Sequence, residues 1–378
     1  MALRVLSIFG TRPEAIKMAP VVQELKRRSG VESRVCVTAQ HREMLDQVLD
    51  LFEIMPDVDL NLMTPNQSLA ELTAAIFTRL DPVLERTQPD WVLVQGDTTT
   101  VMAAALLAFY HRIRVGHVEA GLRTYDKWQP FPEEINRRVA GVVADLHFAP
   151  TEWSRQNLLR EGVPAENIVV TGNTEIDAQQ YVLGKPIPPM AEALLAQMGM
   201  REQADDTRLI LVTAHRRENF GKPLENICQA LLRLVDIYGD TIRILYPVHL
   251  NPNVREPVFR LLYGVPNIIL TDPLDYLPLV HLMKRSTLVV TDSGGIQEEA
   301  PGLGKPVLVM REVTERPEGI EAGSARLVGT DTDRIVAAVC ELLDDSAAYQ
   351  RMAQVVNPYG DGRAAMRIVN ALLARSGR

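Results

Sequence analysis

Short apolar runs alternate with amphipathic segments along most of this chain, and this alternation restricts its possible folds more than any other feature. Segments such as 13–28, 68–87 and 98–111 carry apolar residues at the i, i+3, i+4 spacing of a helix with one buried face. Parallel strands need helical crossovers, so strands and helices that alternate predict βα units, parallel sheets and the α/β class. Strands are expected near 3–9, 34–38, 91–95, 113–118, 146–148, 168–170, 209–213, 242–246, 267–270, 288–291 and 307–310.

The length of 378 residues exceeds the size at which one hydrophobic core usually stops growing, so two domains are expected. The composition changes near 172–206, where a GKPIPP run at 184–189 leads into a polar, acidic stretch. We expect an N-terminal domain over 1–171 and a C-terminal domain over 172–359. The tail 360–378 restarts a helix after a break-prone segment and can cross back to the first domain.

The charge and the cysteines exclude several classes of protein. Forty basic against 48 acidic residues give a net charge of −8, and binding to a phosphate backbone needs a basic surface, so no nucleic-acid partner is expected. The three cysteines are widely spaced without a CxxC pair, which favours a reducing cytoplasm over a disulfide framework. No apolar run approaches about 18 residues and no signal-like segment opens the sequence, so we expect no membrane partner and no export.

Four polar clusters follow expected strands, each at the point where an apolar run ends. They are GTRPEAIK at 10–17, GDTTT at 96–100, GHVEAGLRT at 116–124 and TDSGGIQEEAPGLGKPV at 291–307. Parallel α/β sheets hold their ligands at the carboxyl ends of their strands. The clusters therefore predict one site that is assembled from distant parts of the chain.

The glycine-rich cluster gives the strongest signal for a phosphate. Gly294 and Gly295 let backbone N–H groups approach an anion, Ser293 adds a hydroxyl, and the following helix presents its positive end. A helix cap with a tight turn explains these residues equally well. Glu299 lies one and a half turns into the helix and can accept both hydroxyls of a ribose, whereas the adjacent Glu298 is interpreted as a solvated side chain.

Three cations, Arg12, Lys17 and Arg316, are suited to a diphosphate, although surface solubility would also explain each of them. No GxGxxG motif follows an expected strand, which argues against a nicotinamide or flavin. His117 and Glu119 lie two apart on one strand, but no dense ligand pattern such as HExxH accompanies them. We therefore expect no cofactor and no metal. A GxSxG nucleophile motif is also absent, which argues against a serine hydrolase.

A second group of residues suits acid–base chemistry. Asp97 and Glu119 follow two strands, Glu133 and Glu134 enter a helix, and His215 follows a third strand. Carboxylates gathered in a partly dry pocket repel one another, which raises their pKa values and prepares them for proton transfer. Two other interpretations stay open: Asp97 can simply cap the helix that follows it, and His215, which precedes two arginines, can contact a phosphate.

With these clusters, the segment TAHRREN at 213–219 and the tail motif PYGDGRA at 358–364, the sequence closely resembles the bacterial non-hydrolysing UDP-N-acetylglucosamine 2-epimerases. The resemblance extends from GTRPEAIKMAP at 10–20 to the tail motif, with several long motifs in order. It implies a GT-B fold, in which two Rossmann-like domains with parallel sheets face a central cleft and the C-terminal helix returns to the N-terminal domain.

The resemblance implies reversible C2 epimerisation of UDP-N-acetylglucosamine to UDP-N-acetylmannosamine, by elimination of UDP to a 2-acetamidoglucal intermediate and re-addition. It implies neither metal nor nicotinamide, and it implies a homodimer whose product supplies cell-surface polysaccharide synthesis. Asp97 and Glu133 would transfer protons at C2, Glu119 would tune or share that role, and His215 would assist departure of UDP. By motif, the residues that resemble the UDP contacts are Arg12, Lys17, Ser293, Gly294, Gly295, Glu299 and Arg316.

The chain departs from the family at two places. Some members have Gln and Phe where this chain has Leu274 and Leu279, so the way in which uracil is held stays open here, and backbone groups are candidates. Some members bind a second UDP-N-acetylglucosamine as an activator, and the residues in matching motifs are Gln40, Arg216 and His249. Glu43 and Asn66 replace a Gln and an Arg used there, so allosteric activation stays open.

Three other functions would use some of the same binding and acid–base residues. A hydrolysing epimerase that releases free N-acetylmannosamine shares the first step, and sequence features separate it poorly. A GT-B glycosyltransferase needs room for an acceptor and does not need several carboxylates around C2. A non-enzymatic UDP-sugar sensor needs the binding clusters but not Asp97, Glu119 and Glu133 together.

Overall fold

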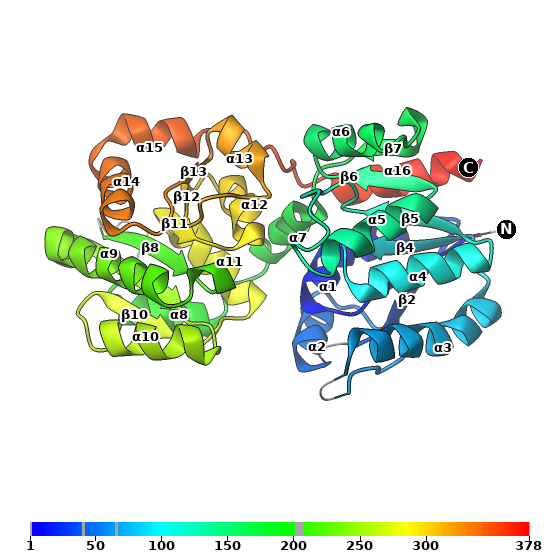
Figure 1. The fold of residues 1–378 in the computed structure, drawn as a ribbon, viewed down its shortest axis with the longest axis horizontal. Helices are drawn as coiled ribbons and strands as arrows, with labels where there is room; N and C mark the ends of the chain where they lie inside the picture. Colours follow the sequence, from blue (N-terminus) through cyan, green and yellow to red (C-terminus); the bar gives the residue numbers. More distant parts are fainter. Residues whose placement is uncertain (1, 40–41, 65–66, 201–206, 378) are drawn as a thin grey trace. The chain divides into compact units, whose positions relative to one another are not determined.

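The computed structural model describes residues 2–39, 42–64, 67–200 and 207–377, and their fold is shown in Figure 1. The chain divides into two compact units, Met1–Tyr181 together with Tyr359–Arg378, and Val182–Pro358. The polypeptide leaves the first unit inside helix α7 (Thr174–Leu183), a helix that begins just after the boundary expected at 171. It re-enters the first unit at Tyr359.

The first unit is built on a seven-stranded sheet with the order β3-β2-β1-β4-β5-β6-β7, in which every pair is parallel. The direction of winding reverses between β1 and β4, and doubly wound sheets bind their ligands at the carboxyl ends of such a pair. The clusters that follow Phe9 and Gln95 begin at this position. The strands are β1 (Leu3–Phe9), β2 (Val31–Val37), β3 (Val58–Asp59), β4 (Trp91–Gln95), β5 (Arg114–Val118), β6 (Leu146–Ala149) and β7 (Ile168–Val170).

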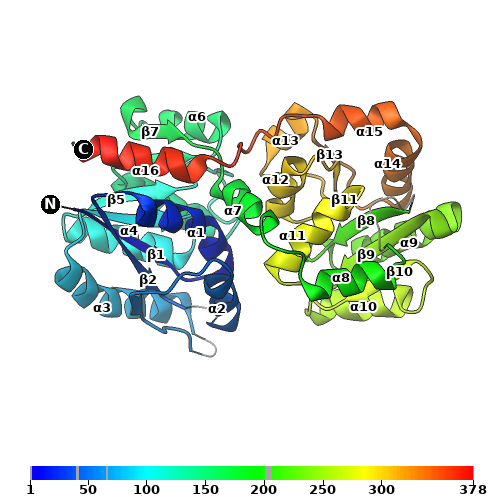
Figure 2. The ribbon, with the colours of Figure 1, turned by 180° about the vertical axis from the view of Figure 1, so that it is seen from behind.

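Helices flank the sheet of the first unit on both faces, with α3, α4 and α5 on one side and α1 and α16 on the other (Figures 1 and 2). Helix α4 is apolar around most of its circumference because it packs on the sheet between α3 and α5, where its alanines permit close approach. The helices are α1 (Arg12–Arg27), α2 (Arg42–Leu51), α3 (Leu69–Thr87), α4 (Thr99–Tyr110), α5 (Glu133–Val143), α6 (Glu152–Arg160) and α16 (Ala364–Arg375).

Helix α16 belongs to the core of the first unit although the whole second unit precedes it in the chain. It packs on α1, and its Ile368, Val369 and Leu372 side chains are fully buried. Two glycines make the approach possible: a Cβ added to Gly172 would lie 3.2 Å from the Cα of Gly360, and both have positive φ angles of 86° and 139°.

The second unit contains a six-stranded parallel sheet with the order β10-β9-β8-β11-β12-β13. Its winding reverses between β8 and β11, so the residues after Thr213 and Thr291 occupy the ligand-binding position of this sheet. The strands are β8 (Arg208–Thr213), β9 (Ile242–Pro247), β10 (Ile268–Thr271), β11 (Leu288–Thr291), β12 (Val307–Val309) and β13 (Ala325–Leu327). The helices are α8 (Pro189–Gln197), α9 (Lys222–Tyr238), α10 (Pro252–Leu262), α11 (Tyr276–Arg285), α12 (Gly294–Gly302), α13 (Pro317–Ala322), α14 (Thr332–Asp344) and α15 (Ser346–Ala353).

The expected α/β class with two parallel sheets is confirmed. Each strand predicted from an apolar run has a counterpart, and the short edge strands β3 and β13 are additional. In the part of the chain that the structure describes, no helix combines the length and the apolar character that a membrane span requires.

Candidate active site

Glu119 is a buried acidic residue of the first unit with an unusual backbone conformation. It directly follows β5, is only 8% exposed, and has a φ of 61°, in the left-handed region that side chains rarely adopt. Both carboxylate oxygens lie 2.8 Å from the Nζ atom of Lys17, and the side-chain amide of Gln95 donates a short hydrogen bond to one of them. Such a backbone costs about 1–3 kcal/mol and persists only where its surroundings hold it. Lys17 and Gln95 provide that support.

Lys17 itself is buried rather than presented to solvent. In addition to Glu119, its Nζ atom lies 3.6 Å from Glu175 at the start of α7. The sequence predicted Lys17 as a diphosphate contact, and its ligands in this structure are carboxylates. Arg12, at the first position of α1, forms no ion pair with a carboxylate in the described ranges, and it adds its charge to the positive end of that helix.

Asp97 follows β4 and does not cap the next helix. The side chain of Thr98 accepts the capping hydrogen bond from the backbone N–H of Val101. Thr98 is therefore the N-cap residue of α4, and the interpretation of Asp97 as a helix cap is wrong. The Asp97 carboxylate lies 3.8 Å from a guanidinium nitrogen of Arg137, and about a third of its side chain is exposed. Surrounding protein nevertheless displaces much of its water. This burial raises the pKa of Asp97 to about 6 against the opposing charge of Arg137, with Glu119 adding to the rise.

The two adjacent glutamates of α5 have different environments. Glu134 is fully buried, accepts hydrogen bonds from the backbone N–H groups of Thr124 and Tyr125 at 3.1 and 3.2 Å, and lies 3.3 Å from Arg137. It therefore anchors the loop that leads into the helix. Glu133, at the first position of α5, is partly exposed and close enough to Asp97 to raise the pKa of that group. Of the pair, Glu133 is the carboxylate that can reach a ligand.

In the second unit, the predicted phosphate cluster forms the start of α12. Ser293 is the N-cap residue, but its side chain makes no capping hydrogen bond to the first turn of the helix. A Cβ at Gly294 would lie 3.0 Å from the guanidinium carbon of Arg316, so a larger residue there would press on that side chain. With Gly295, these residues place a hydroxyl, backbone N–H groups and a cation at one helix N-terminus.

Arg316 is held over Gly294 by two carboxylates. Its Nε atom donates to Glu298 at 2.8 Å, and its Nη1 atom lies 2.9 Å from Glu315. Glu298 is only 2% exposed, so the interpretation of this residue as a solvated glutamate is wrong. It faces inward because Arg316 offers a charge partner there. Burial alone would raise the pKa of Glu315, but Arg316, Arg311 and Arg216 lower it to about 2.

Glu299 is also buried, and its carboxylate accepts a 2.6 Å hydrogen bond from the hydroxyl of Tyr276. Tyr276 opens α11, the helix that carries Leu279 and follows Leu274. Both leucines are partly buried and pack against the hydrophobic core of the second unit. Their side chains thus contribute to the packing of the second unit.

His215 follows β8 and lies beside Asp292 and His249. Its Nδ1 atom is 3.4 Å from the Asp292 carboxylate, and its ring stacks on His249 with centroids 5.6 Å apart. Arg216 lies 3.4 Å from Glu315. The structure thus brings together two of the three residues expected at an allosteric site, Arg216 and His249, next to His215. The third, Gln40, lies outside the described residues.

The residues that sequence reasoning missed are mainly the partners of those it found. Six such residues contact the predicted residues or fix their loops, namely Glu14, Gln95, Arg137, Glu175, Asp292 and Glu315. Two of them carried a local signal: Arg137 lies one helical turn after Glu133, and Glu14 completes a capping box with Thr11. Among the described residues, no group of three His, Cys, Asp or Glu side chains is arranged to hold a metal.

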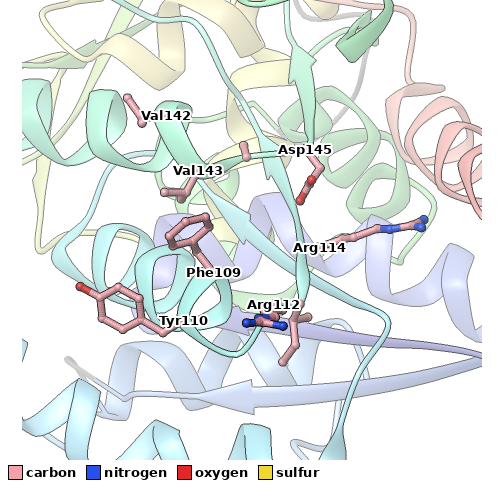
Figure 3. Close-up of a pocket in the computed structure, with 9 residues that line it drawn as sticks. Phe109, Tyr110, Arg112, Arg114, Val142, Val143 and Asp145 are labelled. Atoms are coloured by element: carbon pink, nitrogen blue, oxygen red, sulfur yellow. The ribbon is translucent and has the colours of Figure 1, made fainter.

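A separate cavity of about 690 Å³ lies elsewhere on the first unit (Figure 3). It is lined by Phe109 and Tyr110 at the end of α4, Val142 at the end of α5, and Arg114 and Asp145 at the starts of β5 and β6. These are the amino ends of the strands, whereas Glu119 and Asp97 follow carboxyl ends. Because α/β sheets bind substrates at carboxyl ends, this cavity is not the candidate active site.

Comparison with known proteins identifies a family over nearly the whole chain. A family model described as UDP-N-acetylglucosamine 2-epimerase matches residues 23–373. The UDP-N-acetylglucosamine 2-epimerases of Yersinia pestis and Salmonella typhimurium are each 58% identical to this chain, with 98% of both chains covered. The crystal structure of UDP-GlcNAc 2-epimerase from Neisseria meningitidis bound to UDP-GlcNAc is 52% identical, with a TM-score of 0.89, and covers 98% of this chain and 100% of its own.

Proposed function

This chain belongs to the UDP-N-acetylglucosamine 2-epimerase family and is an isomerase, and from that premise we propose that it inverts C2 by eliminating and re-adding UDP. In the first step a carboxylate removes the C2 proton, the C2–H electrons form a C1=C2 double bond, and the C1–O electrons leave with the β-phosphate oxygen. In the return step that oxygen attacks C1 while C2 takes a proton on the opposite face. Atoms and electrons balance without an oxidant.

The gathering of Asp97, Glu119 and Glu133 in one unit is the observation that carries this proposal. Removal and delivery of a proton on two faces of one carbon needs more than one acid–base group. Asp97, whose pKa is about 6, and the partly exposed Glu133 are the proposed proton-transfer groups. Glu119 tunes them through its charge, and Lys17 keeps that carboxylate in place. A UDP-sugar sensor would need none of these carboxylates.

The diphosphate is the proposed ligand of the α12 N-terminus. Ser293, Gly294 and Gly295 supply a hydroxyl and N–H donors, and Arg316 supplies a charge that stabilises the departing UDP. Arg12 is the proposed cation of the first unit, Glu299 the proposed ribose contact, and His215 the group that assists departure. We propose further that the product supplies cell-surface polysaccharide synthesis and that the assembly is a cytoplasmic homodimer.

The proposal is tested by incubating the full chain with UDP-N-acetylglucosamine in deuterated water and following the sugar by NMR. We expect deuterium at C2 and the manno isomer still attached to UDP. Free N-acetylmannosamine as the first product would identify a hydrolysing enzyme instead. Release or transfer of the sugar with C2 unlabelled would overturn the epimerase mechanism.

The acidity of Asp97 predicts the pH dependence of the reaction. A carboxylate accepts a proton only when ionised, so kcat/KM should fall about tenfold per pH unit below pH 6 and level off above it. Arg137 lowers this pKa, so Arg137→Gln should move the acidic limb to higher pH. Arg138→Gln, which changes an exposed neighbour on α5, should not. If the fall in kcat/KM began only below pH 5, both in the wild type and in Arg137→Gln, Asp97 would not be a proton-transfer group.

A further inference from the structure

Asp292 is a fully buried carboxylate that the mechanism above does not use. It accepts hydrogen bonds from the backbone N–H of His215 at 2.9 and 3.1 Å, from that of Arg216 at 2.9 Å, and from the side-chain amide of Asn219 at 2.9 Å. All of these groups are donors, so the Asp292 carboxylate acts purely as an acceptor towards them. Asp292 therefore fixes the segment that begins with His215.

The sheet of the second unit explains why these residues meet. Strands β8 and β11 are parallel neighbours, and Thr213 pairs in register with Thr291. The residue after Thr291 therefore lies against the segment that leaves β8, and the N–H of Asp292 donates to the carbonyl of Thr213 at 3.1 Å. Although 77 positions separate Asp292 from His215 in the sequence, the strand order makes them neighbours.

The same carboxylate also lies beside the His215 ring, on the side of one ring nitrogen. Nδ1 is 3.4 Å from the fully buried Asp292 carboxylate, and 38% of the His215 side chain is exposed. A carboxylate next to one imidazole nitrogen favours a proton on that nitrogen and leaves the other for the ligand. Burial lowers the pKa of His215, with Arg216 and His249 acting in the same direction and Asp292 and Glu218 opposing them. The ring is thus neutral at pH 8.

We propose that Asp292 is a positioning residue for His215, which holds the His215–Asn219 segment and keeps the ring in its Nδ1-protonated tautomer. Nε2 then carries the lone pair and is the ring atom that can take up a proton. The role of the ring in UDP departure rests on the proposed function, whereas its tautomer does not. The arrangement follows the logic of catalytic histidines that a buried carboxylate orients.

The tautomer is measured directly on the full chain with ¹⁵N-labelled histidine at pH 8. The signals of His215, one of seven histidines, are identified by their absence from His215→Gln. We expect the long-range ¹H–¹⁵N correlations of an Nδ1-protonated ring. An Nε2-protonated ring in the wild type would overturn the proposal, whatever the activity of the protein.

A double-mutant cycle tests the same inference in the reaction. Asp292→Asn should lower kcat about 100-fold with KM within about threefold of wild type, and His215→Gln should cost a similar factor. The double variant should lie within about threefold of His215→Gln, because Asp292 acts through that ring. A further 100-fold loss in the double variant, or an effect confined to KM, would overturn the proposal.

One control variant completes this design. Asp177→Asn replaces another carboxylate that accepts two backbone N–H groups, those of Ala364 and Ala365, and should change kcat by less than about threefold. If Asp292→Asn does not fold, the tautomer measurement on the wild type still decides. A wild type without epimerase activity would overturn the proposed function but would leave the tautomer result intact.

Discussion

We expect Glu133→Gln to slow epimerisation and C2 deuterium exchange by about a thousandfold while UDP binds with nearly unchanged affinity. Glutamine fills the same volume as glutamate but cannot accept a proton, and a positioned acid–base group contributes about 10²–10⁴-fold to a rate. Glu133 is partly exposed at the start of α5, so its replacement leaves no buried charge without a partner. NMR of the exchange and titration calorimetry with UDP measure the two quantities.

Glu152→Gln is the matched control, because Glu152 occupies the first position of α6 as Glu133 does of α5. Both glutamates lie in the first turn of a helix, so both replacements lose the same interaction with the helix dipole. Glu152→Gln should therefore keep wild-type activity. If Glu133→Gln retained more than about a tenth of the wild-type rate, or lost UDP binding to the same extent as turnover, its proton-transfer role would be wrong.

The second large effect is expected at Arg316, whose guanidinium lies over Gly294. Arg316→Gln should weaken UDP binding by about 10–100-fold, since hydrogen bonds to charged groups contribute about 1.5–3 kcal/mol. The loss in kcat/KM should be larger, about 100–1,000-fold, because charge accumulates on the departing diphosphate in the transition state. Calorimetry with UDP and initial rates with UDP-N-acetylglucosamine separate the two effects.

Arg316→Gln also affects stability, because Arg316 is the ion-pair partner of the buried Glu298, and a second substitution at Glu298 separates stability from binding. Arg316→Gln leaves Glu298 buried without its guanidinium, which should lower the free energy of unfolding by about 3–5 kcal/mol. Arg316→Gln combined with Glu298→Gln removes both charges and should recover most of that stability in thermal denaturation. UDP binding should remain weak in the double variant. Recovery of binding together with stability would show that Arg316 has a structural role only.

The alternation of apolar and amphipathic segments was sufficient to predict the α/β class and its parallel sheets, because buried parallel strands and one-sided helices leave strong local patterns. The strands that it missed are both at sheet edges: β3 contains two residues, Val58 and Asp59, and the short strand β13 is interrupted by the charged Arg326. The helical pattern of the tail suggested α16, but no local pattern could place that helix on α1. Its docking depends on Gly172 and Gly360, which are distant in sequence and meet only in the folded chain.

The candidate site was predictable to the extent that its residues follow strands. Four of the predicted residues follow the carboxyl ends of strands, namely Asp97, Glu119, His215 and Ser293. Their partners were not predictable, because strand order and register decide which side chains meet. Asp292 illustrates this: it lies in a segment singled out for phosphate binding, yet its hydrogen bonds depend on β8 being the neighbour of β11.

The docking of α16 has a consequence for the order in which this protein can fold during synthesis. The first unit needs Ile368, Val369 and Leu372 to complete its core, and the ribosome adds these residues only after all of the second unit. Folding from the N-terminus onwards, which is usual for nascent multidomain chains, is therefore interrupted. The residues before Tyr181 must wait with an exposed apolar face on α1, while the second unit can finish first. Nascent chains stalled before α16 are the species on which chaperones should act.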